Sequence, residues 1–243
     1  MGAPFLRRFP LKKETVLSAF RLTAGEFALW AVSAALIVVS FLVFDGSGYL
    51  TLAASLVGVT SLIFCARGNP LGLALMVVFS LLYGLISLGF RYYGEMLTYL
   101  GMTMPMSVYS LVVWLRHPYA GSRTQVAVRR TRPRDWLVMG VLAAAVTAAF
   151  FFILRALNTA NLVLSTVSVA TRFAAVYLTG RRSPYYALAY AANDGVLIAL
   201  WLLAAAEDPA YFSVAVCFAA FLINDLYGFL CWRRMARRQG VHR

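Results

Sequence analysis

The sequence predicts an all-α integral membrane protein with eight transmembrane helices. Of its 243 residues, 62% are hydrophobic and 13% are charged, and the mean hydropathy is +0.76, whereas about a quarter of the residues in a soluble domain are charged. Apolar segments of about 20 residues recur along the chain, which is the length that a helix needs to cross a bilayer. The chain also contains an internal repeat, which predicts two parallel three-helix repeats joined by a linking helix and preceded by one extra N-terminal helix.

The eight apolar segments are separated by glycine, proline, asparagine or charged residues, as in Gly68-Asn69-Pro70 and Glu207-Asp208-Pro209. Because backbone polar groups in lipid need partners within their own segment, the segments are predicted to be helices; β-barrel strands would alternate over about 10 residues. The predicted spans are residues 27–44, 49–66, 70–89, 95–114, 136–155, 159–180, 184–203 and 209–232.

The net charge of +13 indicates membrane topology rather than nucleic-acid binding, because lysine and arginine fall between the spans. With the N-terminus inside, every lysine and arginine lies on the inner side except Arg91, Arg155 and the mid-span Arg172. We therefore predict a multi-pass protein of the cell membrane with cytoplasmic N-terminal (1–26) and C-terminal (233–243) tails.

The longest connection, residues 115–135, is rich in arginine and divides the chain into similar halves. Gly68-Asn69-Pro70 and Arg182-Ser183-Pro184 are each followed by two apolar segments, which end in VYSLVVWLR at 108–116 and LYGFLCWRR at 226–234. Because an odd helix separates the halves, both repeats enter the membrane in the same direction, an arrangement of transporters with a site at the repeat interface. The predicted parts are an extra helix at 27–44, a first repeat at 49–114, a basic loop and linking helix at 115–155, and a second repeat at 159–232.

Polar residues within the spans share helix faces, which predicts a polar, aromatic-lined interior. Spacings of three and four residues connect Asn161, Ser165, Ser168 and Arg172, then Tyr186, Tyr190 and Asn193, and then Asn224 and Tyr227. A primary amide offers donors and an acceptor without a charge to desolvate, so Asn193 and Asn224 are candidate ligand-binding residues. Four tyrosines are candidates for stacking on a flat ring, whether neutral or cationic, with bundle packing as the competing interpretation: Tyr83, Tyr186, Tyr190 and Tyr227.

Charged residues within the spans need partners, because an isolated charge costs about 2–3 kcal/mol or more there. Arg172 is therefore expected to pair with Asp194 or Asp225, in a structural or a gating role. Pro105 lies mid-span in MTMPMSVYS, where it removes a backbone hydrogen bond and predicts a kink, which marks a binding site, a hinge or a purely structural bend. The cysteines show no paired spacing, so neither a metal site nor a cofactor is expected.

These residues resemble the nicotinamide riboside transporters of the PnuC family, which are related in architecture to the SWEET sugar transporters. The resemblance covers about residues 49–234. It rests in the first half on Gly68-Asn69, Tyr83, Tyr93-Gly94-Glu95, Pro105-Met106 and Trp114, and in the second on Leu164-Ser165, Arg181-Arg182, Asn193, Leu200-Trp201 and FLINDLYGFLCWRR. It implies a homotrimer that imports nicotinamide riboside, or a related nucleoside, by facilitated diffusion with alternating access, and a separate kinase that traps the product in the cytosol.

Three departures from the family pattern touch the implied pocket. Where two tryptophans spaced by three usually precede the seventh-segment asparagine, this chain has Tyr185, Tyr186 and Tyr190. Tyr99 stands where an asparagine follows the Tyr-Gly-Glu element, and Ser107 replaces a glutamine after Pro-Met. Tyr99 and Ser107 thus join the predicted pocket, and another vitamin of the thiamine, riboflavin or deoxynucleoside type remains an alternative substrate.

Two other classes of function compete with a transporter. An intramembrane lipid-modifying enzyme would use Asp194, Asp225 or Glu95 as catalytic carboxylates, but the chain has no paired aspartate motif for magnesium and no Ser–His arrangement. A subunit of a larger membrane complex would not explain the internal repeat and the inward polar stripes. We therefore expect a transporter rather than an enzyme.

Overall fold

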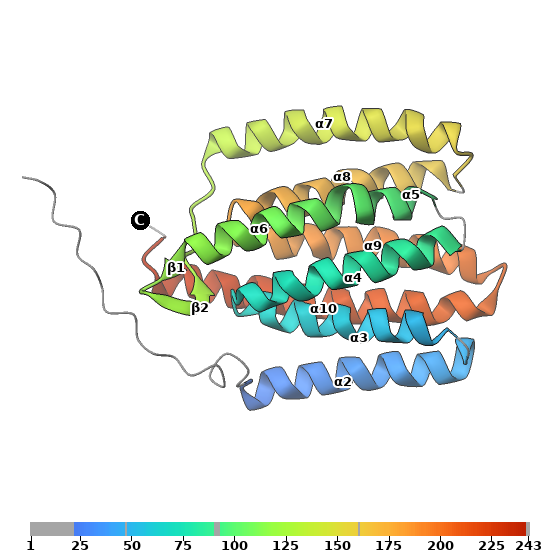
Figure 1. The fold of residues 1–243 in the computed structure, drawn as a ribbon, viewed down its shortest axis with the longest axis horizontal. Helices are drawn as coiled ribbons and strands as arrows, with labels where there is room; N and C mark the ends of the chain where they lie inside the picture. Colours follow the sequence, from blue (N-terminus) through green and yellow to red (C-terminus); the bar gives the residue numbers. More distant parts are fainter. Residues whose placement is uncertain (1–21, 47, 90–92, 160, 242–243) are drawn as a thin grey trace, which may run out of the picture.

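The protein is a bundle of long helices with a small β-hairpin at one end (Figure 1). The computed structural model describes residues 22–46, 48–89, 93–159 and 161–241, so most of the predicted N-terminal tail and Arg91 lie outside the described residues. Within these ranges, eight helices are long and apolar enough to cross a membrane, which confirms the predicted fold class. The spans are Ala24–Asp45, Tyr49–Ala66, Pro70–Leu88, Tyr93–Arg116, Pro133–Ala156, Leu162–Gly180, Tyr186–Ala205 and Pro209–Arg238.

The first three spans are regular apart from one end of the first. The helix α2 begins at a capping box, in which the Thr23 side chain accepts from the Glu26 N–H (3.3 Å) and the Thr23 N–H donates to the Glu26 carboxylate (2.7 Å). These spans comprise α2 (Ala24–Ser40) with the π-helical η1 (Phe41–Asp45), α3 (Tyr49–Ala66) and α4 (Pro70–Gly89).

The fourth span is irregular, as Pro105 predicts. It consists of α5 (Tyr93–Leu97), the π-helical η2 (Thr98–Thr103) and α6 (Met104–Arg116). Pro105 occupies the first turn of α6, where its missing N–H leaves the preceding turn without a regular hydrogen bond. The wide π-helical turns accommodate this loss, and such turns are frequent at functional sites.

The second half repeats the order of the first after a linking helix. The helix α7 (Pro133–Ala156) packs on α8, and Figure 1 shows α7 and α2 at opposite edges of the bundle. Across the halves, α10 packs on α3 and α6 packs on α8, so the third helix of each half contacts the first helix of the other. The remaining elements are α8 (Leu162–Gly180), α9 (Tyr186–Ala205), the 3₁₀ turn η3 (Pro209–Tyr211) and α10 (Phe212–Arg238).

The turns after α3 and α8 follow the same backbone path, which supports the predicted repeat. Gly68 and Arg182 take positive φ angles of 69° and 58°. At the next position, the N–H groups of Asn69 and Ser183 each donate to the carbonyl five residues earlier, at 3.0 Å. Only a residue in the left-handed conformation closes a helix in this way. Glycine takes this conformation readily, whereas Arg182 takes it at a cost in backbone strain.

The two ends of the bundle differ in charge. At the end where α2 begins and α10 ends lie Arg67, Arg116, Arg129, Arg130, Arg132, Arg134, Arg181, Arg182, Arg233, Arg234, Arg237 and Arg238. We call this the arginine-rich end and the other the opposite end. Among the described residues, Arg155 is the arginine at the opposite end, so the segregation of charge follows the prediction.

The connection between α6 and α7 was expected to be an arginine-rich loop, but part of it forms a hairpin. The strands β1 (Pro118–Tyr119) and β2 (Ser122–Val126) pair antiparallel. At the end of β2, the N–H of Val126 donates to the Gly68 carbonyl, and beyond the strand the N–H of Arg129 donates to the Arg182 carbonyl, both at 3.0 Å. We call residues 126–129 the strap, because they bind the equivalent turns of both halves.

Candidate functional site

Arg172, on α8, lies at the centre of a buried polar cluster. Its side chain is 2% exposed, and its guanidinium lies 3.7 Å from the carboxylate of Glu95 on α5. Its Cζ atom lies 3.9 Å from the centroid of the Tyr99 ring, which adds a cation–π contact to the ion pair. The predicted pairing of Arg172 with Asp194 or Asp225 is wrong, because the start of the fourth span brings Glu95 to the guanidinium instead.

Asn193, on α9, joins this cluster. With its amide oxygen directed at the guanidinium, Asn193 accepts from Arg172 Nη2 at 3.0 Å. The amide nitrogen then donates to the Ser168 carbonyl and to Thr171 Oγ1, at 3.0 Å each. The predicted stripe on α8 therefore faces the predicted stripe on α9, and the amide is held in one orientation by three groups of α8.

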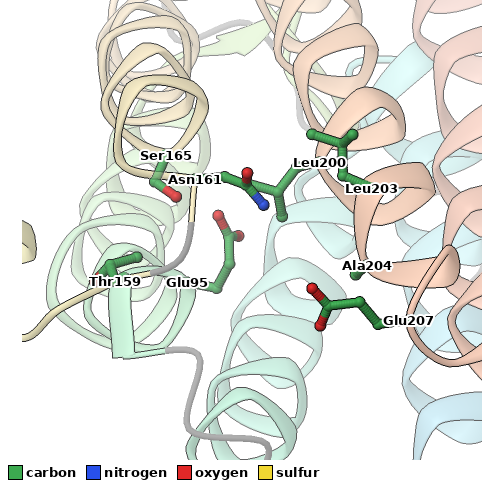
Figure 2. Close-up of a pocket in the computed structure, with 9 residues that line it drawn as sticks. Glu95, Thr159, Asn161, Ser165, Leu200, Leu203, Ala204 and Glu207 are labelled. Atoms are coloured by element: carbon green, nitrogen blue, oxygen red, sulfur yellow. The ribbon is translucent and has the colours of Figure 1, made fainter.

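A pocket opens beside the cluster at the opposite end of the bundle (Figure 2). It encloses a cavity of about 40 Å³, room for about one or two water molecules, so a nucleoside can bind there only after the pocket widens. Figure 2 shows the Glu95 carboxylate directed toward Ser165 and Asn161, with Glu207 across the pocket. Its lining residues are Gly94, Glu95, Thr159, Asn161, Ser165, Leu200, Leu203, Ala204 and Glu207. Because Glu95 both lines the pocket and pairs with Arg172, the pocket leads directly to the polar cluster.

Sequence reasoning did not place Glu95, Thr159 or Glu207 in the pocket. Glu95 stands at the predicted start of a span, where a carboxylate is ordinarily solvated, yet it is 5% exposed. The sequence offered one indication that Glu95 is buried: it lies in the first turn of a helix whose neighbours are all apolar spans. Thr159 and Glu207 lie in loops, for which helical spacing gives no prediction.

Tyr83 and Tyr99 form an aromatic wall on the first-half side of Arg172. Their ring centroids are 4.4 Å apart, and Tyr83 also contacts Phe79 at 5.6 Å and Phe218 at 5.8 Å. Both tyrosines are buried, at 5% and 3% exposure. They lie where a flat ligand beside Arg172 could stack, but in this structure the rings pack on each other.

A second aromatic cluster closes the interface between the halves nearer the arginine-rich end. The Tyr186 ring lies 4.9 Å from that of Trp232 and 6.3 Å from that of Trp114, and the two indole rings are 5.2 Å apart. Tyr190 contacts Tyr186 at 6.2 Å, one turn closer to Arg172 along α9. Both tryptophans are completely buried.

The structure separates Asn224 and Tyr227 from Asn193, which corrects the predicted shared interior. Asn224 Nδ2 donates to Ser33 Oγ on α2 at 2.8 Å. Tyr227, one turn later on the same face of α10, lines a groove near Glu26 at the arginine-rich end. The residue between them, Asp225, is also buried, at 4% exposure, as is Asp194 on α9.

Ser107 and Pro105, both on α6, also lie away from the pocket lining. Ser107 is buried at 3% exposure and stands seven residues before Trp114, as Asp225 stands seven before Trp232. Pro105 is exposed on the outside of the bundle. Their predicted roles in binding and gating stay predictions.

Comparison with known proteins places this arrangement in a family. A family model described as nicotinamide mononucleotide transporter matches residues 48–234. The nicotinamide riboside transporter PnuC of Neisseria mucosa is 23% identical over 216 residues, covering 87% of this chain and 82% of the relative. The nicotinamide riboside transporter PnuC of Haemophilus influenzae is 22% identical over 191 residues, covering 78% and 81%.

The fold is also similar to a crystal structure of the vitamin B3 transporter PnuC. The TM-score is 0.75 at 20% sequence identity, and the match covers 90% of this chain and 94% of the other. All of these relatives are transporters rather than enzymes. Because the family model spans most of the chain, from before α3 almost to the end of α10, the protein belongs to the PnuC family of nicotinamide mononucleotide transporters and is a membrane transporter.

Proposed function

We propose that this transporter carries nicotinamide riboside, or a closely related vitamin-type nucleoside, by facilitated diffusion. The observation that supports this most directly is the buried cluster of Arg172, Glu95, Tyr99 and Asn193 at the base of a pocket, in a chain whose relatives are nicotinamide riboside transporters. The cluster offers an amide, a carboxylate and aromatic rings, which match a carboxamide, ribose hydroxyls and a flat ring.

The charge of the pocket favours the riboside over the mononucleotide, which differ by one phosphate. The described residues that line the pocket include two carboxylates, Glu95 and Glu207, and no basic side chain. Arg172 lies deeper and is already paired with Glu95. A phosphate brings roughly two negative charges at neutral pH, which these carboxylates repel and which no free cation of the described lining compensates.

Transport in this proposal alternates between two exposures of one site. The pocket at the opposite end widens to admit substrate, while the cluster of Tyr186, Trp114 and Trp232 closes the arginine-rich end. Rocking of the halves about the π-helical turns before Pro105 then opens the other side. Arginine segregation supports a cytoplasmic arginine-rich end in the cell membrane, so the direction is import, with cytosolic phosphorylation trapping the product.

The family resemblance further implies a homotrimer. The linking helix α7 contacts α8 and leaves large apolar side chains exposed, among them Leu137 (68%), Val141 (61%) and Phe152 (66%). Such a face suits lipid or a neighbouring subunit equally, so the mass of the purified protein in detergent tests this part of the proposal.

Uptake into proteoliposomes tests the transported substrate. Labelled nicotinamide riboside is expected to enter vesicles containing the purified protein, without a proton or sodium gradient, until inside and outside concentrations are equal. Nicotinamide mononucleotide is expected not to enter. Thiamine, riboflavin and deoxynucleosides are tested as competitors in the same assay. They are included because tyrosines replace the tryptophans that the family pattern implies near Asn193. Uptake of the mononucleotide, or of neither compound, would contradict the proposal.

A further inference from the structure

The strap lies against the aromatic cluster at the arginine-rich end. Val126 is completely buried and Val128 is 7% exposed, and both pack in the apolar cluster that contains Trp114 and Trp232. Ala127, between them, is half-buried, as expected for an extended segment in which alternate side chains face the same way. The strap is therefore part of the closure between the halves and not a free surface loop.

The side chain of Gln239 binds the middle of the strap. Its Oε1 accepts from the Val128 N–H at 2.7 Å, and its Nε2 donates to the Val126 carbonyl at 3.2 Å. One primary amide thus serves a backbone donor and a backbone acceptor two residues apart, as a neighbouring β-strand would. The strap is therefore fixed by a residue 110 or more positions later in the chain.

Gln239 takes its place from the end of α10. Its N–H donates to the Met235 carbonyl at 2.9 Å, and the N–H of Val241 donates to the Ala236 carbonyl at 3.0 Å. Gly240, between them, has a φ angle of 71°, which closes the helix through a left-handed residue. Because α10 is the third helix of the second half, Gln239 ties the strap to that half.

The middle of the strap is bonded to both halves. On the first half, the Ala127 N–H donates at 2.9 Å to the carbonyl of His117, at the end of α6. On the second half, Gln239 makes two hydrogen bonds and Arg182 Nη1 makes one, to the Ala127 carbonyl at 3.3 Å. If the halves separate at this end, the middle of the strap must leave one of them, and Gln239 makes two of these three bonds on the second-half side.

We propose that the strap is the gate of the arginine-rich end and that Gln239 is the latch that keeps this gate closed. The inference rests on the proposed function, in which the halves rock apart at that end. Release of the Gln239 amide frees the middle of the strap, so that Val128 leaves the tryptophan cluster. The bonds at the two ends of the strap, to Gly68 and Arg182, persist, so the gate opens while the halves stay connected.

Two native cysteines allow opening to be measured separately at the two ends of the bundle. Cys65, near the end of α3, packs in the same apolar cluster as Val126, and its carbonyl accepts from Trp232 Nε1 at 2.8 Å. Cys217, in the half of α10 nearer the opposite end, packs in the other apolar cluster. They are 3% and 4% exposed, so a water-soluble maleimide alkylates each only when its surroundings open. The partly exposed Cys231 is first replaced by serine.

The test measures both alkylation rates on purified protein by peptide mass spectrometry. In the Cys231→Ser background, Gln239→Ala is expected to raise the rate at Cys65 about tenfold, because the gate loses two hydrogen bonds, and to leave the rate at Cys217 unchanged. Gln125→Ala is the matched control, at a half-buried glutamine of β2 outside the latch, and should alter neither rate.

The outcomes separate the latch from general loosening and from the proposed function. An equal rise at both cysteines means that Gln239 only stabilises the fold, and no rise at Cys65 means that the strap is not a gate; either result overturns the inference. Alkylation needs no substrate, so both results leave the proposed function standing. The proposed function fails instead if the wild type takes up no nicotinamide riboside, and this outcome does not change the alkylation rates.

Discussion

Trp114 and Trp232 make the same hydrogen bond in opposite directions across the two halves of the transporter. Trp114 Nε1 donates to the carbonyl of Thr179 at 3.0 Å, and Trp232 Nε1 donates to the carbonyl of Cys65 at 2.8 Å. Each tryptophan lies in the last two turns of the third helix of its own half, and each acceptor lies three residues before the left-handed residue of the other half's turn. The same tryptophan–carbonyl hydrogen bond therefore occurs twice in the interface at the arginine-rich end.

Removing either indole N–H is expected to loosen this interface. Trp114→Phe and Trp232→Phe each remove one hydrogen bond to a buried carbonyl that keeps a backbone donor, the N–H of Arg182 or of Gly68, so each should cost about 0.5–1.5 kcal/mol. The thermal unfolding midpoint in detergent measures the loss. Trp136→Phe, at a side chain that is 40% exposed, serves as the control, and an equal shift in all three variants would show that the two hydrogen bonds contribute nothing specific.

The ion pair of Arg172 and Glu95 is expected to behave as a unit. Arg172→Gln or Glu95→Gln alone leaves a buried charge uncompensated, which costs about 3–5 kcal/mol. The double variant should be less destabilised than the sum of the two single variants, and a double-mutant cycle of thermal stabilities measures this coupling. Strict additivity would mean that the two side chains do not interact in the membrane.

Two buried asparagines on neighbouring helices offer a matched pair for the substrate site. Asn193→Ala removes an amide of the Arg172 cluster. It is expected to reduce the affinity for nicotinamide riboside at least tenfold, because that change corresponds to about the free energy of one hydrogen bond to a charged group. Asn224→Ala removes an amide that bonds Ser33, so it should lower stability and leave affinity nearly unchanged. Calorimetric titration of both variants distinguishes them, and loss of binding in Asn224→Ala alone would reverse the assignment.

The turn at Gly68 is expected to tolerate no side chain. A Cβ atom there would meet the Met235 side chain at 3.2 Å and Val126 Cγ1 at 3.3 Å, and φ is +69°. Gly68→Ala should therefore cost about 1–2 kcal/mol of stability. Gly140→Ala, within α7 and with nothing within 4 Å of the added atom, should be neutral or stabilising by up to about 1 kcal/mol. Thermal unfolding of the two variants checks both predicted changes in stability.

The elements that the sequence predicted well depend on local properties of the chain. Hydropathy located the spans, and the last differs most because α10 continues through its arginines to Arg238. Spacing along α8 and α9 predicted that Arg172 and Asn193 face the interior, because residues three and four apart share a face.

What the sequence did not predict depends on which helices become neighbours. Periodicity placed Asn224 and Tyr227 on one face of α10, but α2 rather than the second-half interior covers that face. The partner of Arg172 follows from the packing of η2 and α6 near α8, which spacing within one helix does not specify. The hairpin turn at Ala120 and Gly121, with φ angles of 49° and 77°, lacks the Asn-Gly pair that usually marks such a turn.

The strap limits how far the two halves can move apart. Val126 and Arg129 are three residues apart and are bonded to the turns at Gly68 and Arg182, and an extended chain reaches at most about 3.3–3.6 Å per residue. While both hydrogen bonds persist, the N–H groups of Val126 and Arg129 can therefore lie no more than roughly 10 Å apart, which limits the separation of the two turns. In the proposed alternating-access cycle, the length of this short connection between α6 and α7 would therefore set the amplitude of the motion.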